Sequence, residues 1–184
     1  MKKLALLAAV LLVLAACGGK DGEKEAGEEN REGTSCSTPV DQNGSPAPSP
    51  TPNFALGKAI LDGDDGSVLV NIEIAETGEQ HSQGLMFRSS LDEDCGMLFV
   101  FFEEMTGGFY MKNTLIPLSI AFFDIDGTIV KILDMEPCKE DPCTIYEPGV
   151  AYHGALEVNK GAFSEWGIEE GDPIRIVQNN RNKT

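Results

Sequence analysis

The 184-residue chain carries 14 Lys and Arg against 30 Asp and Glu, which gives a formal net charge of −16 at pH 7. So negative a protein repels the phosphates of nucleic acids and the head groups of anionic lipids, so we expect no nucleic-acid partner. A hydrophobic content of 41% is normal for a globular domain.

The N-terminus has the pattern of a bacterial lipoprotein signal. Lys2 and Lys3 precede the short apolar run 4–14, and small residues then lead to Cys17. This order of a charged region, an apolar region and small residues predicts cleavage before Cys17 and a lipid on its thiol. The apolar run is shorter than the roughly 20 residues that a membrane span needs. An ordinary secretory signal, with Cys17 as a bystander, is the alternative.

The lipoprotein interpretation places the protein outside the cytosol, anchored to the cell membrane or the outer membrane. Several acyl chains on one cysteine hold a protein on a bilayer stably, so the lipid is the expected membrane contact. The acidic and Pro-rich segment 18–53 is expected to be a disordered tether, with its proline-spaced part 45–52 extended. Residues 54–184 are expected to form a single globular domain, and residues 1–17 the signal peptide.

Four cysteines remain if Cys17 is lipidated. An even number of cysteines in an exported chain indicates disulfides. Cys138 and Cys143 flank a short polar turn, and pairing of Cys36 with Cys95 then follows by elimination. A metal site or a redox pair is the alternative, although the spacing is not the C-x-x-C of those sites.

Many short runs of β-branched and aromatic residues predict strands along the domain. The alternating run 67–75 is expected to pair with 59–61. The runs 118–123 and 128–133 flank Asp-Ile-Asp-Gly at 124–127, which is a hairpin signature. Further strands are predicted at 97–101, 108–113, 154–158 and 173–177.

Two short helices complete the predicted elements. Thr77 and Gln80 have the spacing of a capping box and predict a helix that runs to about Met86. Asn159 is expected to cap a second helix that ends before Gly167, a residue suited to the C′ position. Many strands with two short helices favour a mainly β (α+β) domain, built as a small rolled sheet or a barrel-like sheet.

Six sequence blocks within the domain occur together in one order. The blocks are GLMFR (84–88), GMLFVF (96–101), MKNTLIPL (111–118), FDIDG (123–127), MEPC (135–138) and ALEVNKG (155–161). Together they resemble the domain-of-unknown-function family 192, over about residues 55–180. The resemblance implies a compact, mainly β domain that is often exported, and it implies no activity, cofactor or partner.

Arg88, Lys112, Asn113 and Thr114 are the candidate ligand-binding residues. Arg88 and Lys112 are conspicuous cations in a very acidic domain and could receive a carboxylate or another anion. On a strand, Lys112 and Thr114 would project to the same face. This favours a non-catalytic binding module for a small anion, a glycan or an envelope partner. The alternative is that each cation pairs with a local Asp or Glu.

Two other functions have weaker support in the sequence. Paired carboxylates such as Asp124 and Glu157 would suit an envelope hydrolase, although chance proximity also explains such a pair in a domain with so many acids. Thioethers bind Cu(I), but filling of irregular core space explains recurrent methionines equally well. The methionines of the domain are Met86, Met97, Met105, Met111 and Met135. We expect no catalytic residue, no metal and no cofactor.

Overall fold

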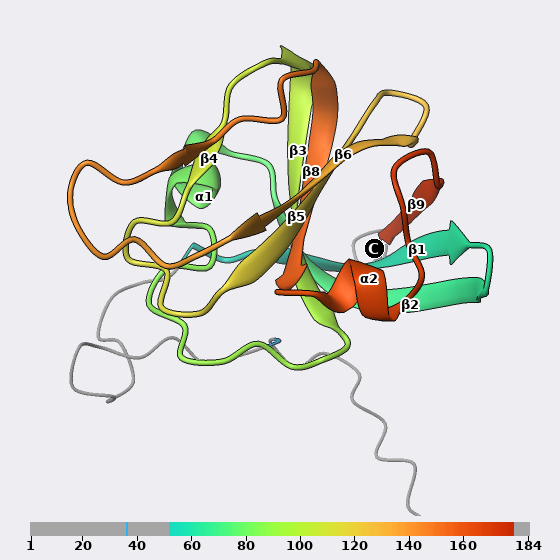
Figure 1. Ribbon diagram of the computed structural model, residues 1–184, viewed down its shortest axis with the longest axis horizontal. Coiled ribbons are helices and arrows are strands. Elements are labelled where there is room, and N and C mark those ends of the chain that lie inside the picture. The colour runs from blue at the N-terminus through green and yellow to red at the C-terminus, as the bar shows by residue number, and fades with distance from the viewer. Residues whose placement is uncertain (1–35, 37–51, 179–184) are drawn as a thin grey trace, which may run out of the picture. The chain divides into compact units, whose positions relative to one another are not determined.

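A computed structural model describes Cys36 and residues 52–178 of the chain (Figure 1). The predicted signal peptide, Cys17, the rest of the tether and residues 179–184 lie outside the described residues. No helix in the described part of the chain is long and apolar enough to cross a membrane. The elements are β1 (Ala55–Gly63), β2 (Gly66–Ala75), α1 (Gly78–Gln83), β3 (Cys95–Met105), β4 (Phe109–Tyr110), β5 (Leu118–Phe123), β6 (Ile129–Met135), β7 (Ile145–Tyr146), β8 (Tyr152–Asn159), α2 (Ala162–Glu165) and β9 (Ile174–Gln178).

Seven strands form one mixed sheet in the order β6-β5-β8-β3-β2-β1-β9, and β4 pairs with β7 separately. Strands β2 and β3 run parallel, while the other neighbours in the large sheet are antiparallel. The two edges approach each other at one isolated bridge between Thr128 and Pro173. There the backbone N–H of Ile174 donates to the carbonyl of Gly127 at 2.7 Å. The sheet is therefore rolled but not closed, which confirms the mainly β prediction with two short helices.

Both predicted hairpins are present because local sequence specifies their turns. In the β5–β6 turn, the carboxylate Oδ1 of Asp124 accepts from the backbone N–H groups of Asp126 and Thr128 at 3.0 and 2.8 Å. Gly127 completes the turn at φ 81°, and a Cβ at this position would lie 2.5 Å from the carbonyl oxygen of Ile174. Only glycine combines this conformation with so close an approach of the opposite edge. Asp124 is thus a turn residue.

The helix predictions are partly confirmed. Thr77 and Gln80 form the reciprocal capping box of α1, but this helix ends at Gln83 rather than near residue 86. Asn159 does not cap α2, because its side chain Nδ2 instead donates to the carbonyl of Leu91 at 2.9 Å. Gly161 occupies the N-cap of α2 without a side-chain cap.

Strand alternation gives the sheet two buried faces. On the first, which we call the α2 face, apolar strand residues pack with Phe163 of α2. On the second, the α1 face, strand residues including Phe99 and Phe122 pack with Leu85, which follows α1. Figure 1 shows α1 and α2 on opposite sides of the paired strands β3 and β8.

Candidate functional site

The two predicted ligand-binding cations both have carboxylate partners. Arg88 forms an ion pair with Glu73 on the α1 face, and both residues are only 3% exposed. Lys112 lies 3.3 Å from the carboxylate of Asp141 in an exposed pair. These ion pairs agree with the alternative stated above, in which each cation pairs with a carboxylate of the protein instead of a ligand. Arg88 is therefore buried within the domain, and Lys112 is the exposed cation of the two.

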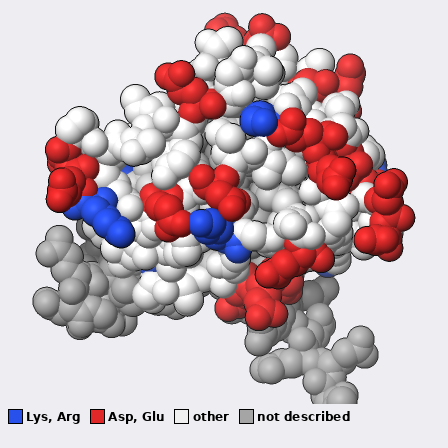
Figure 2. Space-filling model, in the orientation of Figure 1, with Lys and Arg blue, Asp and Glu red and all other residues white. Residues whose placement is uncertain are grey.

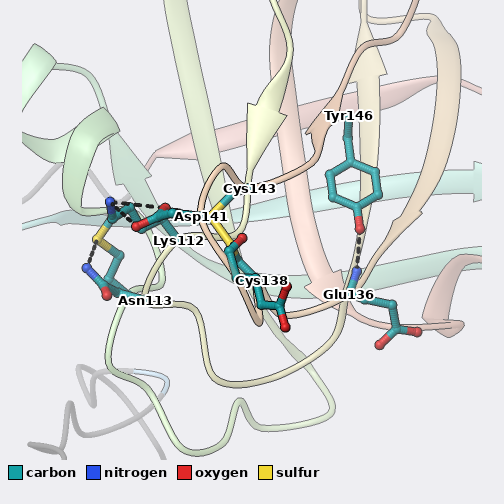
Figure 3. Close-up of a disulfide and its surroundings, with 9 residues drawn as sticks. Lys112, Asn113, Glu136, Cys138, Asp141, Cys143 and Tyr146 are labelled. Carbon is teal, nitrogen blue, oxygen red and sulfur yellow. Dashed lines mark hydrogen bonds and ion pairs between the residues drawn. A yellow bond between two sulfur atoms is a disulfide. The ribbon is translucent and has the colours of Figure 1, made fainter.

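The block at residues 111–114 is a turn and not part of a strand, because β4 ends at Tyr110. Asn113 has φ 58°, a left-handed conformation that ends extended structure. Figure 3 shows Lys112 directed toward Asp141 in the loop closed by a disulfide. The prediction that Lys112 and Thr114 share a strand face is wrong. Lys112 and Asn113 are exposed, whereas Thr114 is buried.

Thr114 instead contributes to a pocket on the α1 face with a volume of about 190 Å³. One wall is formed by residues 81–86, which include the end of α1, and another by residues 107–110, which include β4. The remaining lining residues are Phe99, Phe101, Met105, Thr114, Tyr152 and Glu157. The pocket thus lies where two irregular segments cross strands β3 and β8.

Glu157 is the buried acid of this pocket. It lies in the C-terminal half of β8, between Met97 of β3 and Ile120 of β5, and it is 6% exposed. Its carboxyl group has no hydrogen bond or ion pair with any residue between 52 and 178 that the structure describes. Burial raises its pKa to about 8, because desolvation disfavours the charged form. At neutral pH the carboxyl group is therefore mostly protonated.

Two other polar side chains of the pocket walls already have polar partners within the protein. The Tyr152 hydroxyl donates to the carbonyl of Gly107 at 2.8 Å, and burial raises the pKa of this tyrosine to about 12. His81 Nε2 lies 3.0 Å from the carbonyl of Ala75, and the ring packs on Phe101 with a centroid distance of 4.7 Å. Glu157 and Thr114 are therefore the buried polar lining residues whose side chains are available to hydrogen-bond a ligand.

The paired carboxylates expected for a hydrolase do not meet in this pocket. Asp124 serves its own turn and does not line the pocket. Glu73 lies on the same sheet face as Glu157, but Met97 stands between them, so their Cα atoms are about 10 Å apart. Arg88 also holds the Glu73 carboxylate. Among the described residues that line the pocket, Glu157 is the sole acid.

The methionines divide between core and pocket. Met97, Met111 and Met135 are at most 2% exposed and fill the core of the α1 face. Met86 and Met105 line the pocket, and the Met86 sulfur lies 3.9 Å from Asn113 Nδ2. Core filling therefore accounts for three of the five methionines considered for copper.

Both predicted cysteine pairs are disulfides. Cys36 is bonded to Cys95, with 5.7 Å between their Cα atoms, and Cys138 is bonded to Cys143, with 5.4 Å. The carboxylate of Asp141 lies within 4.8 Å of both sulfur atoms of the second pair (Figure 3). Because a metal ligand must be a free thiolate, the oxidised pair is not a metal site.

The comparisons with known proteins identify the family. The family model DUF192, described as an uncharacterized ACR, matches residues 60–176, and the chain belongs to this family. A crystal structure from Sinorhizobium meliloti 1021, described as a candidate transcription regulator, is 30% identical. It matches with a TM-score of 0.64 over 69% of this chain and 98% of that chain.

A second solved structure gives a similar match. It is a protein of unknown function from Novosphingobium aromaticivorans DSM 12444, with 29% identity, a TM-score of 0.63 and coverage of 71% of this chain and 92% of that chain. A comparison with curated proteins found no match. The predicted family and the mainly β fold are thus confirmed. The descriptions of these matches assign no activity to the family.

Proposed function

We propose that this domain is a small-molecule binding module of the cell envelope, and that its ligand occupies the pocket beside Glu157. The observation that carries the proposal is a buried carboxyl group, without a partner in the described protein, facing a preformed pocket. Among the described residues no fully enclosed side-chain oxygen lacks a hydrogen bond, so the Glu157 oxygens open onto the pocket. A ligand in the pocket could bind the carboxyl group there, which gives a physical reason for its place in β8.

The dimensions and walls of the pocket favour a small ligand with an apolar body. Drug-sized ligands occupy pockets of about 300–1,000 Å³, whereas this pocket measures about 190 Å³. Phenyl rings and methionine side chains make up much of the wall. Thr114 adds a hydroxyl group to the same pocket lining as the Glu157 carboxyl group, so two polar contacts would orient the ligand.

This site differs from the anion-binding surface that the sequence favours. That hypothesis depended on Arg88 and Lys112, whose charges are already neutralised by Glu73 and Asp141. Of the four predicted binding residues, Thr114 keeps its role in the proposed site. A glycan or an envelope protein remains a second kind of partner for the exposed Lys112 and Asn113.

The location of the module outside the cytosol depends on Cys17. The charged, apolar and small-residue pattern before Cys17 supports cleavage and lipid attachment there. Replacing Cys17 by Ser should prevent acylation and release the protein from the membrane fraction. Mass spectrometry of the mature N-terminus measures this directly, and an unprocessed Met1 on membrane-bound protein would contradict the anchor.

Nucleic acid is disfavoured as a partner by the charge of the domain. Residues 52–178 contain 23 acidic and 7 basic side chains, and such a surface repels phosphates. The name given to the Sinorhizobium meliloti protein therefore supplies no DNA-binding argument for this chain.

A fragment screen on the isotope-labelled mature protein tests the pocket. Bound fragments should shift the NMR signals of residues that line it, such as Leu85, Gly107 and Thr114. Glu157→Leu should weaken the polar fragments at least tenfold, because their partner is removed. Glu104→Gln is the matched control, since Glu104 is an exposed acid that lies outside the pocket. Fragment shifts that avoid the pocket, or that Glu157→Leu leaves unchanged, would refute the proposed site.

A further inference from the structure

We infer that the ligand of this pocket is a small organic ammonium ion, with its charged nitrogen beside Glu157 and its hydrocarbon part among the aromatic rings. The inference rests on the proposed function, because it takes the pocket as the binding site and specifies the chemistry of its ligand. The sequence favours an anionic ligand, whereas this inference specifies a cationic one.

The charge balance of the pocket is the first argument. Glu157 is the sole acid among its described lining residues, and none of these residues is a lysine or arginine. Glu73, the other buried acid of the α1 face, is neutralised by Arg88. Glu157 has no such partner among the residues that the structure describes, so a cationic ligand could supply one when Glu157 is ionised. An ammonium group would complete a pair of the kind that the protein already makes two strands away.

The aromatic lining is the second argument. Phe99 and Phe109 meet edge to face with a centroid distance of 5.0 Å, and Phe101 and Tyr152 do so at 5.6 Å. All four rings line the pocket. A cation over an aromatic face gains roughly 0.5–2 kcal/mol, more where water is excluded. An acid and aromatic rings that line one pocket form the combination that recognises organic ammonium ions, whose methyl or methylene groups also need apolar contact.

The field of the whole domain is the third argument. Acidic side chains outnumber basic ones 23 to 7 between residues 52 and 178. Figure 2 shows acidic side chains spread over the visible face, with few lysines and arginines among them. A surface of one sign raises the local concentration of ions of the opposite sign. Cationic ligands are therefore attracted to this domain before they reach the pocket, and anionic ligands are repelled.

A neutral ligand is the competing occupant, because a protonated Glu157 could donate a hydrogen bond to a carbonyl or hydroxyl oxygen. The two ligand classes respond oppositely to pH. An ammonium ion binds the ionised acid and binds more tightly as the pH rises through 8, whereas a neutral acceptor binds the protonated acid and binds more weakly. The other titratable groups facing Glu157 across the pocket are His81, Tyr110 and Tyr152, and the Glu73–Arg88 pair lies two strands away.

The experiment measures binding of two matched pairs of probes to the mature protein by NMR titration. Choline is compared with its uncharged isostere 3,3-dimethylbutan-1-ol, and benzylammonium with benzyl alcohol. Each ammonium ion should bind at least tenfold more tightly than its alcohol at pH 8. Choline affinity should rise about tenfold between pH 7 and pH 9, because the ionised fraction of an acid with pKa about 8 rises by that factor. Glu157→Gln should abolish this rise, while Glu104→Gln should retain it.

The outcomes separate this inference from the proposed function. If the alcohols bind as well as the ammonium ions, or if choline affinity falls with rising pH, the pocket prefers a neutral ligand. Either result overturns the ammonium inference but leaves the pocket as the binding site. If neither pair of probes binds at millimolar concentration, the ammonium inference is also overturned. The fragment screen then decides independently whether the pocket binds any small molecule.

Discussion

The two faces of the seven-stranded sheet pack against equal numbers of buried apolar residues in the described part of the chain, but they differ in chemistry. Each contributes a cluster of fourteen buried residues, so the contrast does not come from the amount of core. The α2 face is packed by aliphatic strand residues and the side chains of α2. The α1 face buries Glu73 and Glu157, and the segment that covers it supplies the buried Arg88. Since buried ionisable groups cost stability, the α1 face is the part of the domain where stability has been given up, as is common at functional sites.

The largest expected effect on the α1 face comes from Arg88. Arg88→Met should lower the free energy of unfolding by about 3–5 kcal/mol, because Glu73 is left buried without its partner. Urea denaturation at pH 7 measures the loss. Lys112→Met is the control, since it breaks the exposed pair with Asp141 and should cost about 1 kcal/mol or less. Equal losses in the two variants would show that the buried pair has no special role.

On the α2 face, Phe163 is the corresponding test. Phe163→Ala should also cost about 3–5 kcal/mol, because it removes a ring that is 2% exposed and leaves a cavity. The variant should keep the choline affinity of the wild type when it is folded, since Phe163 lies on the opposite side of the sheet from the pocket. Loss of ligand binding in the folded variant would mean that the two faces are coupled, and the contrast drawn above would fail.

The disulfides sharpen the comparison with an intermediate effect. The Cys36–Cys95 bond spans 59 residues, whereas Cys138–Cys143 spans 5. Cross-linking restricts the unfolded chain more when the closed loop is longer, so the double Cys→Ser variants should lose about 4 and about 2 kcal/mol respectively. Thermal unfolding of both variants measures the order. A larger loss from the short loop would point to contacts rather than to chain entropy.

The pH dependence due to Glu157 is expected to be about as large as the effect of removing the short disulfide. Its pKa is raised to about 8 in the folded protein, so the stability it contributes is full below its unfolded pKa and is lost as the pH rises toward 8. Relative to Glu157→Gln, the wild type should therefore lose roughly 2 kcal/mol of unfolding free energy between pH 5 and pH 7. Denaturation of both proteins at the two pH values measures the difference. If the difference in unfolding free energy between the two proteins is the same at pH 5 and pH 7, the pKa of Glu157 is not raised by folding.

The sequence predicts the sheet better than it predicts the site. The hairpin at residues 124–127 and the capping box of Thr77 and Gln80 depend on neighbours along the chain, and both predictions are confirmed. The strand predicted at 108–113 stops at Tyr110, because Asn113 turns the chain despite the aromatic and apolar residues before it. Likewise Asn159 has a better partner in the Leu91 carbonyl than in a helix terminus.

Glu157 shows why the site escapes local interpretation. In the sequence, Glu157 is an acid flanked by apolar residues in Ala-Leu-Glu-Val. Glu73 has the same kind of neighbours in Asn-Ile-Glu-Ile, so this local pattern does not distinguish the two acids. Both acids lie on the α1 face of the rolled sheet. Arg88 reaches one of them and leaves the other facing the pocket, and this difference comes from residues far apart in the chain.

The amino-acid sequence alone therefore determined the family, the mainly β fold and the hairpins, and it predicted the Cys138–Cys143 pair, because periodicity, turn chemistry and short cysteine spacing act over short distances. The pairing of Cys36 with Cys95 was settled only by the structure. Only the tertiary structure decided which charges are neutralised, where Thr114 lies and which buried acid has no ion-pair partner among the described residues. Those properties depend on burial and on contacts across the sheet, and desolvation acts on a carboxyl group only after the chain has folded around it.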